Sequence, residues 1–268
     1  MSGLVRLTAR DGASALAPLG EGEEFPAAPG GVYTTLRTAG GRPVLAAAHL
    51  RRLTANCAAS GLPAPPDSGR FADWIAQTVA RVGGEARIRV ECRPPGEWRV
   101  TGEPLDPPAA LKLWIAPPGS AREHPELKVT DRAQIEALEA LGRAAGADEA
   151  LLRDADGAIV ETSRSNFYAV ASDGAVVTPD TGALPGVALA WVLEQLQAGG
   201  IPARRARIAP GALAEWRELF ASSAVKGPVP VVTLVRPDGP PGIVSEGPVV
   251  KYLRAKWLDL LAETARGA

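Results

Sequence analysis

Strand pairs joined by glycine turns, with single helices between them, are the feature that most restricts the fold of this chain. Residues 149–154 and 158–163 flank the turn Asp-Ala-Asp-Gly, and residues 166–171 and 175–179 flank Ser-Asp-Gly. A glycine turn between two β-branched runs predicts a hairpin. Helical patterns over 131–146, 187–197 and 245–265 separate or follow these pairs. The alternation predicts an α+β or mixed α/β protein.

A further helix is predicted over 44–61, because Gly61 and the Pro-rich stretch after it end an apolar periodic run. Two faces of this helix share one spacing, an apolar one with Leu50, Leu53 and Cys57 and a polar one with His49, Arg52 and Asn56. A second helix follows at about 70–82, and strands are expected at 86–94, 97–104 and 111–118.

A polar, proline-rich stretch at 117–126 divides the chain. Its 268 residues are enough for one large domain or two small ones. We therefore predict a small N-terminal domain over 1–116, a linker over 117–124 and a larger C-terminal domain over 125–268.

Composition excludes several classes of function. Two cysteines and two histidines leave no disulfide framework and no metal site, and a net charge of −1 gives no electrostatic footprint for nucleic acid. The N-terminus lacks a signal-peptide core, and no apolar run approaches the length of a membrane span. We expect a cytoplasmic protein that acts on small molecules, without a bound metal, a nucleic-acid partner or a membrane.

Common catalytic motifs are missing or poorly placed. The sequence has no dinucleotide fingerprint, no Walker loop and no nucleophile elbow. Ser223 and Lys226 fit the S-x-x-K spacing, but Gly227 and Pro228 follow at once and argue against the helix which that mechanism needs. A serine hydrolase is therefore a minor alternative.

Lysine is scarce, so each one is a candidate for chemistry. The five are Lys112, Lys128, Lys226, Lys251 and Lys256. Lys128 alternates with Leu127 and Val129 before a helix start, which would let it point into a cleft. On periodicity alone, an exposed strand lysine is the favoured reading of this position.

The order of the motifs adds a family resemblance. The segments GVYTTLRT, HLRRL, LKVTDR, DEALLRDADGAIVETSRSNFYAV, LPGVAL and SSAVKGPVPVV follow one another over about residues 30–260. This order resembles the fold-type IV, pyridoxal-phosphate-dependent enzymes, which include branched-chain and D-amino-acid aminotransferases and aminodeoxychorismate lyase. The resemblance implies a small N-terminal α+β domain, a larger C-terminal pseudo-barrel domain, pyridoxal 5'-phosphate in the cleft between them, and a homodimer.

The resemblance also implies roles for single residues. Lys128 matches the lysine that forms the Schiff base with the cofactor, and Glu161 matches the carboxylate that faces the pyridine nitrogen. Arg52 matches the arginine that holds the phosphate, for which a planar guanidinium is well suited. Arg51 would point about 100° away around the helix and is expected to face solvent.

Further positions match phosphate and substrate contacts. The implied phosphate contacts are Gly186, Val187 and Ala188 at a helix start, and Ser222 and Ser223 in a second loop; the substrate contacts are Tyr33, Thr35 and Arg37. The chain departs from the family where it has Thr162 after Glu161 instead of glycine, and Ala188 instead of threonine. The segment before residue 30 matches poorly.

The favoured function is transfer of an amino group between an amino acid and a 2-oxo acid. The alternative is β-elimination from 4-amino-4-deoxychorismate to 4-aminobenzoate and pyruvate, since the run Tyr33-Thr34-Thr35 looks like that of some lyase members. A binding protein that has kept the fold but lost the cofactor is the remote third possibility.

Overall fold

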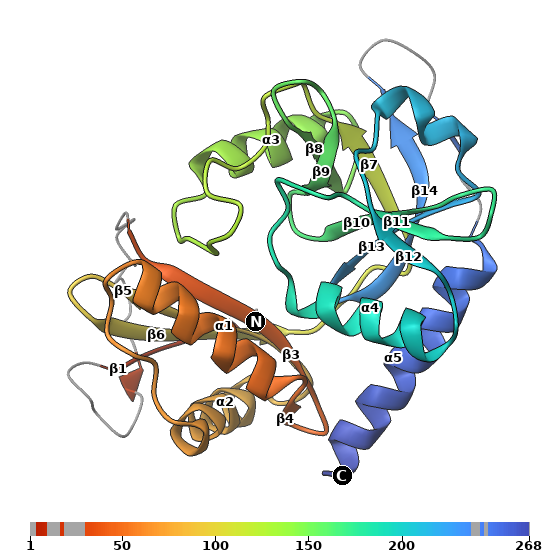
Figure 1. The fold of residues 1–268 in the computed structure, drawn as a ribbon. Coiled ribbons are helices and arrows are strands. Elements are labelled where there is room, and N and C mark those ends of the chain that lie inside the picture. The colour runs from red at the N-terminus through yellow and green to blue at the C-terminus, as the bar shows by residue number, and fades with distance from the viewer. Residues whose placement is uncertain (1–3, 10–16, 19–29, 237–241, 244–245, 268) are drawn as a thin grey trace. The chain divides into compact units, whose positions relative to one another are not determined.

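The computed structural model describes residues 4–9, 17–18, 30–236, 242–243 and 246–267. These residues form two compact units (Figure 1). Unit 1 consists of Met1–Asp106, Leu127–Asp131 and Asp259–Ala268, and unit 2 consists of Pro107–Glu126 and Arg132–Leu258. Most of residues 1–29, the segment that matches the family poorly, lies outside the described residues.

The division differs from the predicted domain boundaries for a physical reason. Strand β7 (Leu111–Ile115), predicted within the 1–116 domain, pairs with β8 and β14 of unit 2. Residues 127–131, predicted within the 125–268 domain, pair with a strand of unit 1. Strand pairing therefore places the Lys128 segment with the N-terminal residues.

Unit 1 is a sheet covered on one face by two helices, α1 (Ala46–Ala59) and α2 (Ser68–Val82). The described strands follow the order β2-β1-β6-β5-β3-β4. Their bounds are β1 Val5–Ala9, β2 Ala17–Pro18, β3 Val32–Ala39, β4 Arg42–Pro43, β5 Ala86–Arg93 and β6 Glu97–Pro104. Leu53 and Cys57 of α1 are buried against this sheet, which confirms the predicted apolar face of the helix.

The segment 127–131 extends this sheet beyond the edge of β3. Val129 bridges Val32 in antiparallel fashion, the Tyr33 N–H donates to the Lys128 carbonyl at 2.9 Å, and the Thr130 N–H donates to the Gly31 carbonyl at 2.8 Å. A Cβ atom at Gly31 would lie only 2.8 Å from Thr130 Oγ1 and 2.9 Å from the Cys92 carbonyl oxygen. Glycine is therefore required for this close approach.

Unit 2 is a curled sheet whose described strands follow the order β12-β11-β10-β13-β14-β7-β8-β9, with β15 beside β14. The remaining bounds are β8 Glu149–Arg153, β9 Ile159–Thr162, β10 Asn166–Val170, β11 Val176–Thr178, β12 Ala203–Arg205, β13 Glu218–Ser223, β14 Gly227–Val235 and β15 Gly242–Ile243. The predicted hairpins are confirmed as the antiparallel pairs β8–β9 and β10–β11. Ile159 of β9 also bridges Ile208, just beyond β12, so the two ends of the sheet meet.

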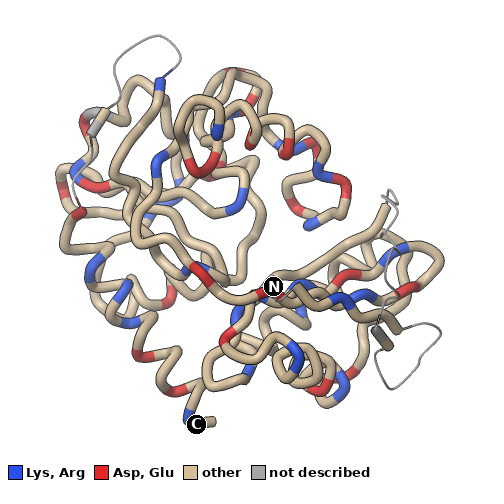
Figure 2. The backbone as a smooth tube through the Cα atoms, turned by 180° about the vertical axis from the view of Figure 1, so that it is seen from behind, with Lys and Arg blue, Asp and Glu red and all other residues tan. Residues whose placement is uncertain are grey.

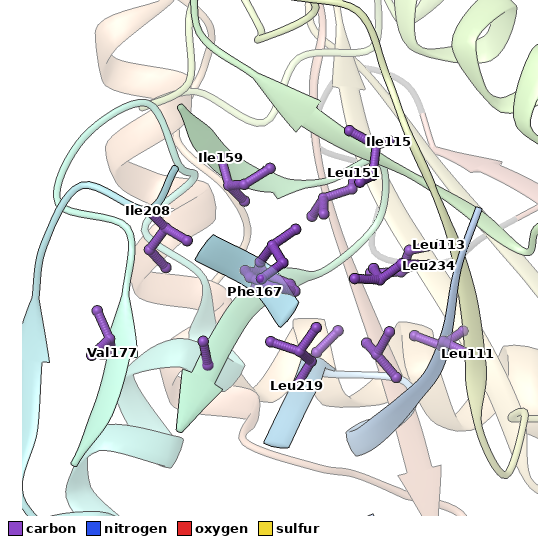
Figure 3. Close-up of a cluster of buried hydrophobic side chains, with 14 of the residues drawn as sticks. Leu111, Leu113, Ile115, Leu151, Ile159, Phe167, Val177, Ile208, Leu219 and Leu234 are labelled. Atoms are coloured by element: carbon purple, nitrogen blue, oxygen red, sulfur yellow. The ribbon is translucent and has the colours of Figure 1, made fainter. Parts of the chain in front are cut away.

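This curl encloses the core of unit 2. Leu113, Leu151, Phe167, Leu219 and Leu234 come from five strands and pack in one buried cluster, and their side chains gather on the inner side of the curl in Figure 3. Fold-type IV architecture, with a pseudo-barrel in the larger unit, is the fold that the sequence predicts.

Helices lie outside the curl (Figure 1). Helix α3 (Ala133–Ala144) packs on β8, while α4 (Val187–Ala198) and α5 (Pro248–Arg266) meet through Trp191 and Trp257 at a ring-centroid distance of 5.0 Å. A short 3-10 helix spans Pro210–Glu215. The buried carboxylate of Glu218 accepts hydrogen bonds from the N–H groups of Val249 and Val250, at 3.1 Å each, and so caps the start of α5.

Charged residues of both signs are interspersed along the chain in each unit (Figure 2). Among the residues that the structure describes, no helix combines the length and apolar character needed to cross a bilayer. The same residues contain no group of three or more His, Cys, Asp or Glu side chains placed to hold a metal ion.

Candidate functional site

The backbone of Lys128, in unit 1, is held in place by hydrogen bonds. The Lys128 carbonyl accepts a hydrogen bond from the Tyr33 N–H in the sheet. The Lys128 N–H donates to the side-chain oxygen of Asn56 at 2.9 Å, in the amide orientation that gives both the oxygen and the nitrogen of Asn56 a partner. Asn56 then also donates to the Arg52 carbonyl at 3.2 Å. The Lys128 amino group lies 4.7 Å from the centroid of the Tyr33 ring. The polar face of α1 thus positions the lysine that the motif order singled out.

The other lysines are poorer candidates for a nucleophilic amine. Lys226 forms an ion pair with Glu149, and the two side chains are only 11% and 3% exposed. This contact occupies the amine of Lys226 with a carboxylate. Lys112, Lys251 and Lys256 are exposed. The pairing of Lys226 with Glu149 also argues against the serine-hydrolase hypothesis, in which the Lys226 amine would activate Ser223.

Arg52 has the properties of an anion-binding residue. Its Nη2 donates to Thr34 Oγ1 at 2.8 Å, while its buried Nε has no hydrogen-bond partner among the described residues. Burial lowers the pKa of Arg52 to about 10, although the neighbouring Tyr33 acts in the opposite direction. The guanidinium remains charged at neutral pH, and an anionic ligand would compensate that buried charge. Arg51 is exposed, as its position on the helix predicts.

The three predicted substrate contacts share one face of β3. Tyr33, Thr35 and Arg37 alternate with Thr34 and Leu36, which point to the helix side of the sheet. The Arg89 guanidinium lies 3.8 Å from the centroid of the Tyr33 ring, so the ring has the side-chain nitrogens of both Arg89 and Lys128 close to it.

In unit 2, Glu161 is held from two directions. Arg122 Nε donates to its Oε1 at 2.6 Å, and the Leu184 N–H donates to its Oε2 at 3.1 Å. Arg122 also donates to the Ser163 carbonyl at 2.8 Å. The Glu161 side chain is 4% exposed. Arg122 was not predicted to have a role, because it lies in the stretch assigned to the linker and no spacing in the sequence connects it with Glu161.

The turn before α4 is built against the same residues. Asn166 Nδ2 donates to the Leu184 carbonyl at 2.8 Å, and a Cβ atom at Gly186 would collide with Asn166 Oδ1. Helix α4 begins at Val187 without a side-chain cap, so its first N–H groups are open donors. Such a helix start favours a phosphate or another anion.

These features agree with a comparison of the whole sequence. The sequence profile of the family described as amino-transferase class IV matches residues 31–234. The chain belongs to the class IV aminotransferase family. Members of this family are pyridoxal-phosphate-dependent enzymes, as the resemblance implied. Among curated proteins, no sequence matches this chain significantly.

Solved structures agree on the fold. A branched-chain aminotransferase from Thermoproteus uzoniensis superposes with a TM-score of 0.82 at 20% identity, over 96% of this chain and 95% of that one. A pyridoxal-phosphate-bound hypothetical aminotransferase from Mycobacterium tuberculosis superposes with a TM-score of 0.75 at 19% identity, over 97% of this chain and 98% of that one. A Legionella pneumophila protein proposed to be a 4-amino-4-deoxychorismate lyase superposes with a TM-score of 0.74 at 17% identity, over 87% of this chain and 91% of that one. At these identities the likeness shows the fold alone.

The residues of this class IV chain fit pyridoxal phosphate in each unit. Unit 1 offers Arg52, whose buried Nε has no hydrogen-bond partner in the described part of the chain, and a lysine with a fixed backbone. Unit 2 offers a buried carboxylate and an uncapped helix start. Ser222 is fully buried and its hydroxyl is bound to the Tyr168 hydroxyl at 2.8 Å, whereas Ser223 is half-buried. Ser223 Oγ accepts from the Lys226 N–H at 3.2 Å.

The departures from the family pattern have local explanations. Thr162 Oγ1 accepts from the Ser165 N–H at 2.7 Å and lies 2.5 Å from Glu149 Oε2, so its hydroxyl caps the turn that follows Glu161. Ala188 is buried at the start of α4. It removes a hydroxyl but leaves the backbone donors of the helix in place.

We predict that Gly186→Ala weakens cofactor binding by about tenfold, because the new methyl group displaces the Asn166 side chain and with it the start of α4. The measurement is the dissociation constant of pyridoxal phosphate in a titration of the apoprotein. Gly211→Ala is the matched control, since a Cβ atom at that exposed glycine meets nothing within 4 Å. Equal affinities of the two variants would contradict the role given to the turn.

Proposed function

We propose that this enzyme attaches pyridoxal phosphate to Lys128 and transfers an amino group between an amino acid and a 2-oxo acid. The observation that carries the proposal is the placement of Lys128 on the edge of β3. Its backbone is fixed by Tyr33 and Asn56, while the other lysines are exposed or, in the case of Lys226, bound to a carboxylate. Arg52, Gly186, Val187, Ala188, Ser222 and Ser223 form the proposed phosphate-binding set.

Pyridoxal phosphate supplies an aldehyde carbon for the substrate amine and an aromatic ring that accepts electrons from the substrate Cα. The protein supplies the proton transfers. With the cofactor and substrate bound, the amine of Lys128 would take the Cα proton as a general base and return it as a general acid. The Tyr33 ring lies beside that amine, with its centroid 4.7 Å from Nζ, and limits the orientations that the amine can adopt.

Glu161 supplies a fixed negative charge. Its carboxylate would face the pyridine nitrogen and keep it protonated, which is the state in which the ring accepts electrons best. Arg122 and the Leu184 N–H each occupy one oxygen of Glu161. A carboxylate oxygen has two lone pairs, so each oxygen can accept a further hydrogen bond. The two donors hold the carboxylate in place and leave each of its oxygens able to accept another hydrogen bond.

A second reaction has specific support. The run Tyr33-Thr34-Thr35 looks like that of some lyase members, and the fold is shared with the Legionella pneumophila protein proposed to be a 4-amino-4-deoxychorismate lyase. In that reaction the same amine of Lys128 would remove the Cα proton, after which the leaving group departs instead of the amino group being transferred. We propose Thr35 and Arg37 as substrate contacts in either case, and a homodimer as the assembly.

Products distinguish the two reactions. We expect the purified holoenzyme to convert pyruvate or 2-oxoglutarate to the corresponding amino acid when supplied with a panel of L- and D-amino acids. The measurement is the new amino acid, detected by chromatography. Formation of 4-aminobenzoate and pyruvate from aminodeoxychorismate, with no transfer to any 2-oxo acid, would contradict the aminotransferase and support the lyase.

We predict that borohydride reduction of the holoenzyme leaves the cofactor covalently bound to the peptide that contains Lys128. Peptide mass spectrometry locates the label. Lys128→Ala should lose the absorbance of the bound cofactor and nearly all turnover, whereas Lys112→Ala, at an exposed position on β7, should keep both. A label on Lys226 or Lys112 would show that the assignment is wrong.

We predict that Glu161→Gln lowers turnover by about two orders of magnitude or more while cofactor occupancy stays nearly unchanged. The substitution keeps the size of the side chain but removes the charge that favours a protonated pyridine nitrogen. Turnover and the absorbance of the bound cofactor are measured on the same sample. Glu136→Gln, at an exposed position on α3, is the control. Near-normal turnover in Glu161→Gln would mean that another residue faces the nitrogen.

A further inference from the structure

The polar face of α1 is buried, which is unusual for polar residues of a two-layer unit. His49 and Asn56 are 0% and 3% exposed. Asn56 holds the Lys128 backbone, as described above. His49, in contrast, has no part in any contact assigned so far. Its Nδ1 lies 2.7 Å from Thr34 Oγ1, the same oxygen that accepts from Arg52.

The three side chains form a hydrogen-bond chain with one consistent direction. Arginine has only donors, so Arg52 Nη2 must donate to Thr34 Oγ1. The Thr34 hydroxyl carries a single proton, and His49 Nδ1 lies within hydrogen-bond distance of it. Donation of that proton to Nδ1 satisfies both atoms. The order is therefore Arg52 to Thr34 to His49.

This order requires a neutral imidazole with its proton on Nε2. Burial, together with the positive charges of Arg52 and Lys128, holds the pKa of His49 well below its ordinary value. A neutral ring accepts at Nδ1, whereas an imidazolium would have only donors. His49 Nε2 is buried and finds no acceptor among the described residues, so the ring makes its polar contact through Nδ1.

We propose that His49 is a positioning residue, which acts through the Thr34 hydroxyl to fix the guanidinium of Arg52 for a phosphate monoester ligand. The inference rests on the proposed role of Arg52. A hydroxyl that donates to His49 must turn a lone pair toward Arg52, and that lone pair fixes Nη2. The guanidinium is planar, so fixing Nη2 also sets the direction in which the unpartnered Nε–H points.

A comparison of two ligands tests this role. Pyridoxal phosphate and pyridoxal carry the same aldehyde and ring, and only the first has a phosphate. The dissociation constants of both are measured with the apoprotein for wild type, Thr34→Val, Thr34→Ser, His49→Leu, Arg52→Ala and the double variant Thr34→Val with Arg52→Ala. Thr34→Val removes the hydroxyl at constant shape, and Thr34→Ser retains it. Arg51→Ala, at an exposed position, is the control for the helix.

We expect Thr34→Val and His49→Leu to weaken binding of pyridoxal phosphate by about tenfold and binding of pyridoxal by less than about twofold. Thr34→Ser and Arg51→Ala should behave as wild type. Thr34→Val should add nothing in the Arg52→Ala background, because the chain would already be broken. If His49→Leu does not fold, the isosteric Thr34→Val carries the test.

Three outcomes would overturn the proposal. Equal losses for both ligands in Thr34→Val would show a merely structural role. Multiplying effects of Thr34→Val and Arg52→Ala would show that the two residues act independently. A selective loss in Arg52→Ala without one in Thr34→Val would remove the positioning chain but keep Arg52 as the phosphate residue. Equal losses for both ligands in Arg52→Ala would instead contradict the proposed role of Arg52 itself.

Discussion

The pairing of residues 127–131 with the edge of β3 is the interaction on which the proposed chemistry depends. This short segment is separated in sequence from the strand it extends, and backbone hydrogen bonds with Gly31 and Tyr33 return it to unit 1. The pairing sets the register of Lys128 against the Tyr33 ring and against the amide of Asn56. A shift by one residue would reverse the side of the sheet to which the lysine points.

Unit 2 uses one backbone position in a comparable way. The Leu184 N–H donates to Glu161 and the Leu184 carbonyl accepts from Asn166, so a single peptide connects the carboxylate, the turn and the start of α4. The Glu161 carboxylate and the start of α4, to which we assign roles in cofactor binding as a proposal, are consequently not independent. Movement of the turn would displace both, and a side chain at Gly186 would force such a movement because its Cβ atom would collide with Asn166.

Sequence patterns predicted the elements better than the partners of buried charges. The two hairpins, the faces of α1 and the lysine segment follow from local spacing and from motif order, and the structure has them. Helix α3 shows the limit: Leu141 follows the buried Leu138 at apolar helical spacing but is 56% exposed, whereas Glu139 is buried. Glu139 is held by Arg132 and Arg164, and that pairing depends on the tertiary fold. Strand pairing likewise makes the boundary between the units differ from the predicted one at residue 116, because β7 pairs with β8 and β14 of unit 2.

Ion pairs and hydrogen bonds converge on the turn that follows Glu161, and this convergence gives the strongest physical reason to regard that turn as a rigid platform. Arg122 holds Glu161, Glu139 holds Arg164, and Glu149 accepts from the hydroxyl groups of both Thr162 and Ser165. Removing one partner of the buried Arg122–Glu161 pair would leave the other charge uncompensated, which costs about 3–5 kcal/mol. Each of these contacts therefore resists displacement of the same few residues. A carboxylate that stabilises charge on a bound ligand works best when its position does not relax, and the surrounding pairs restrain Glu161 in that way.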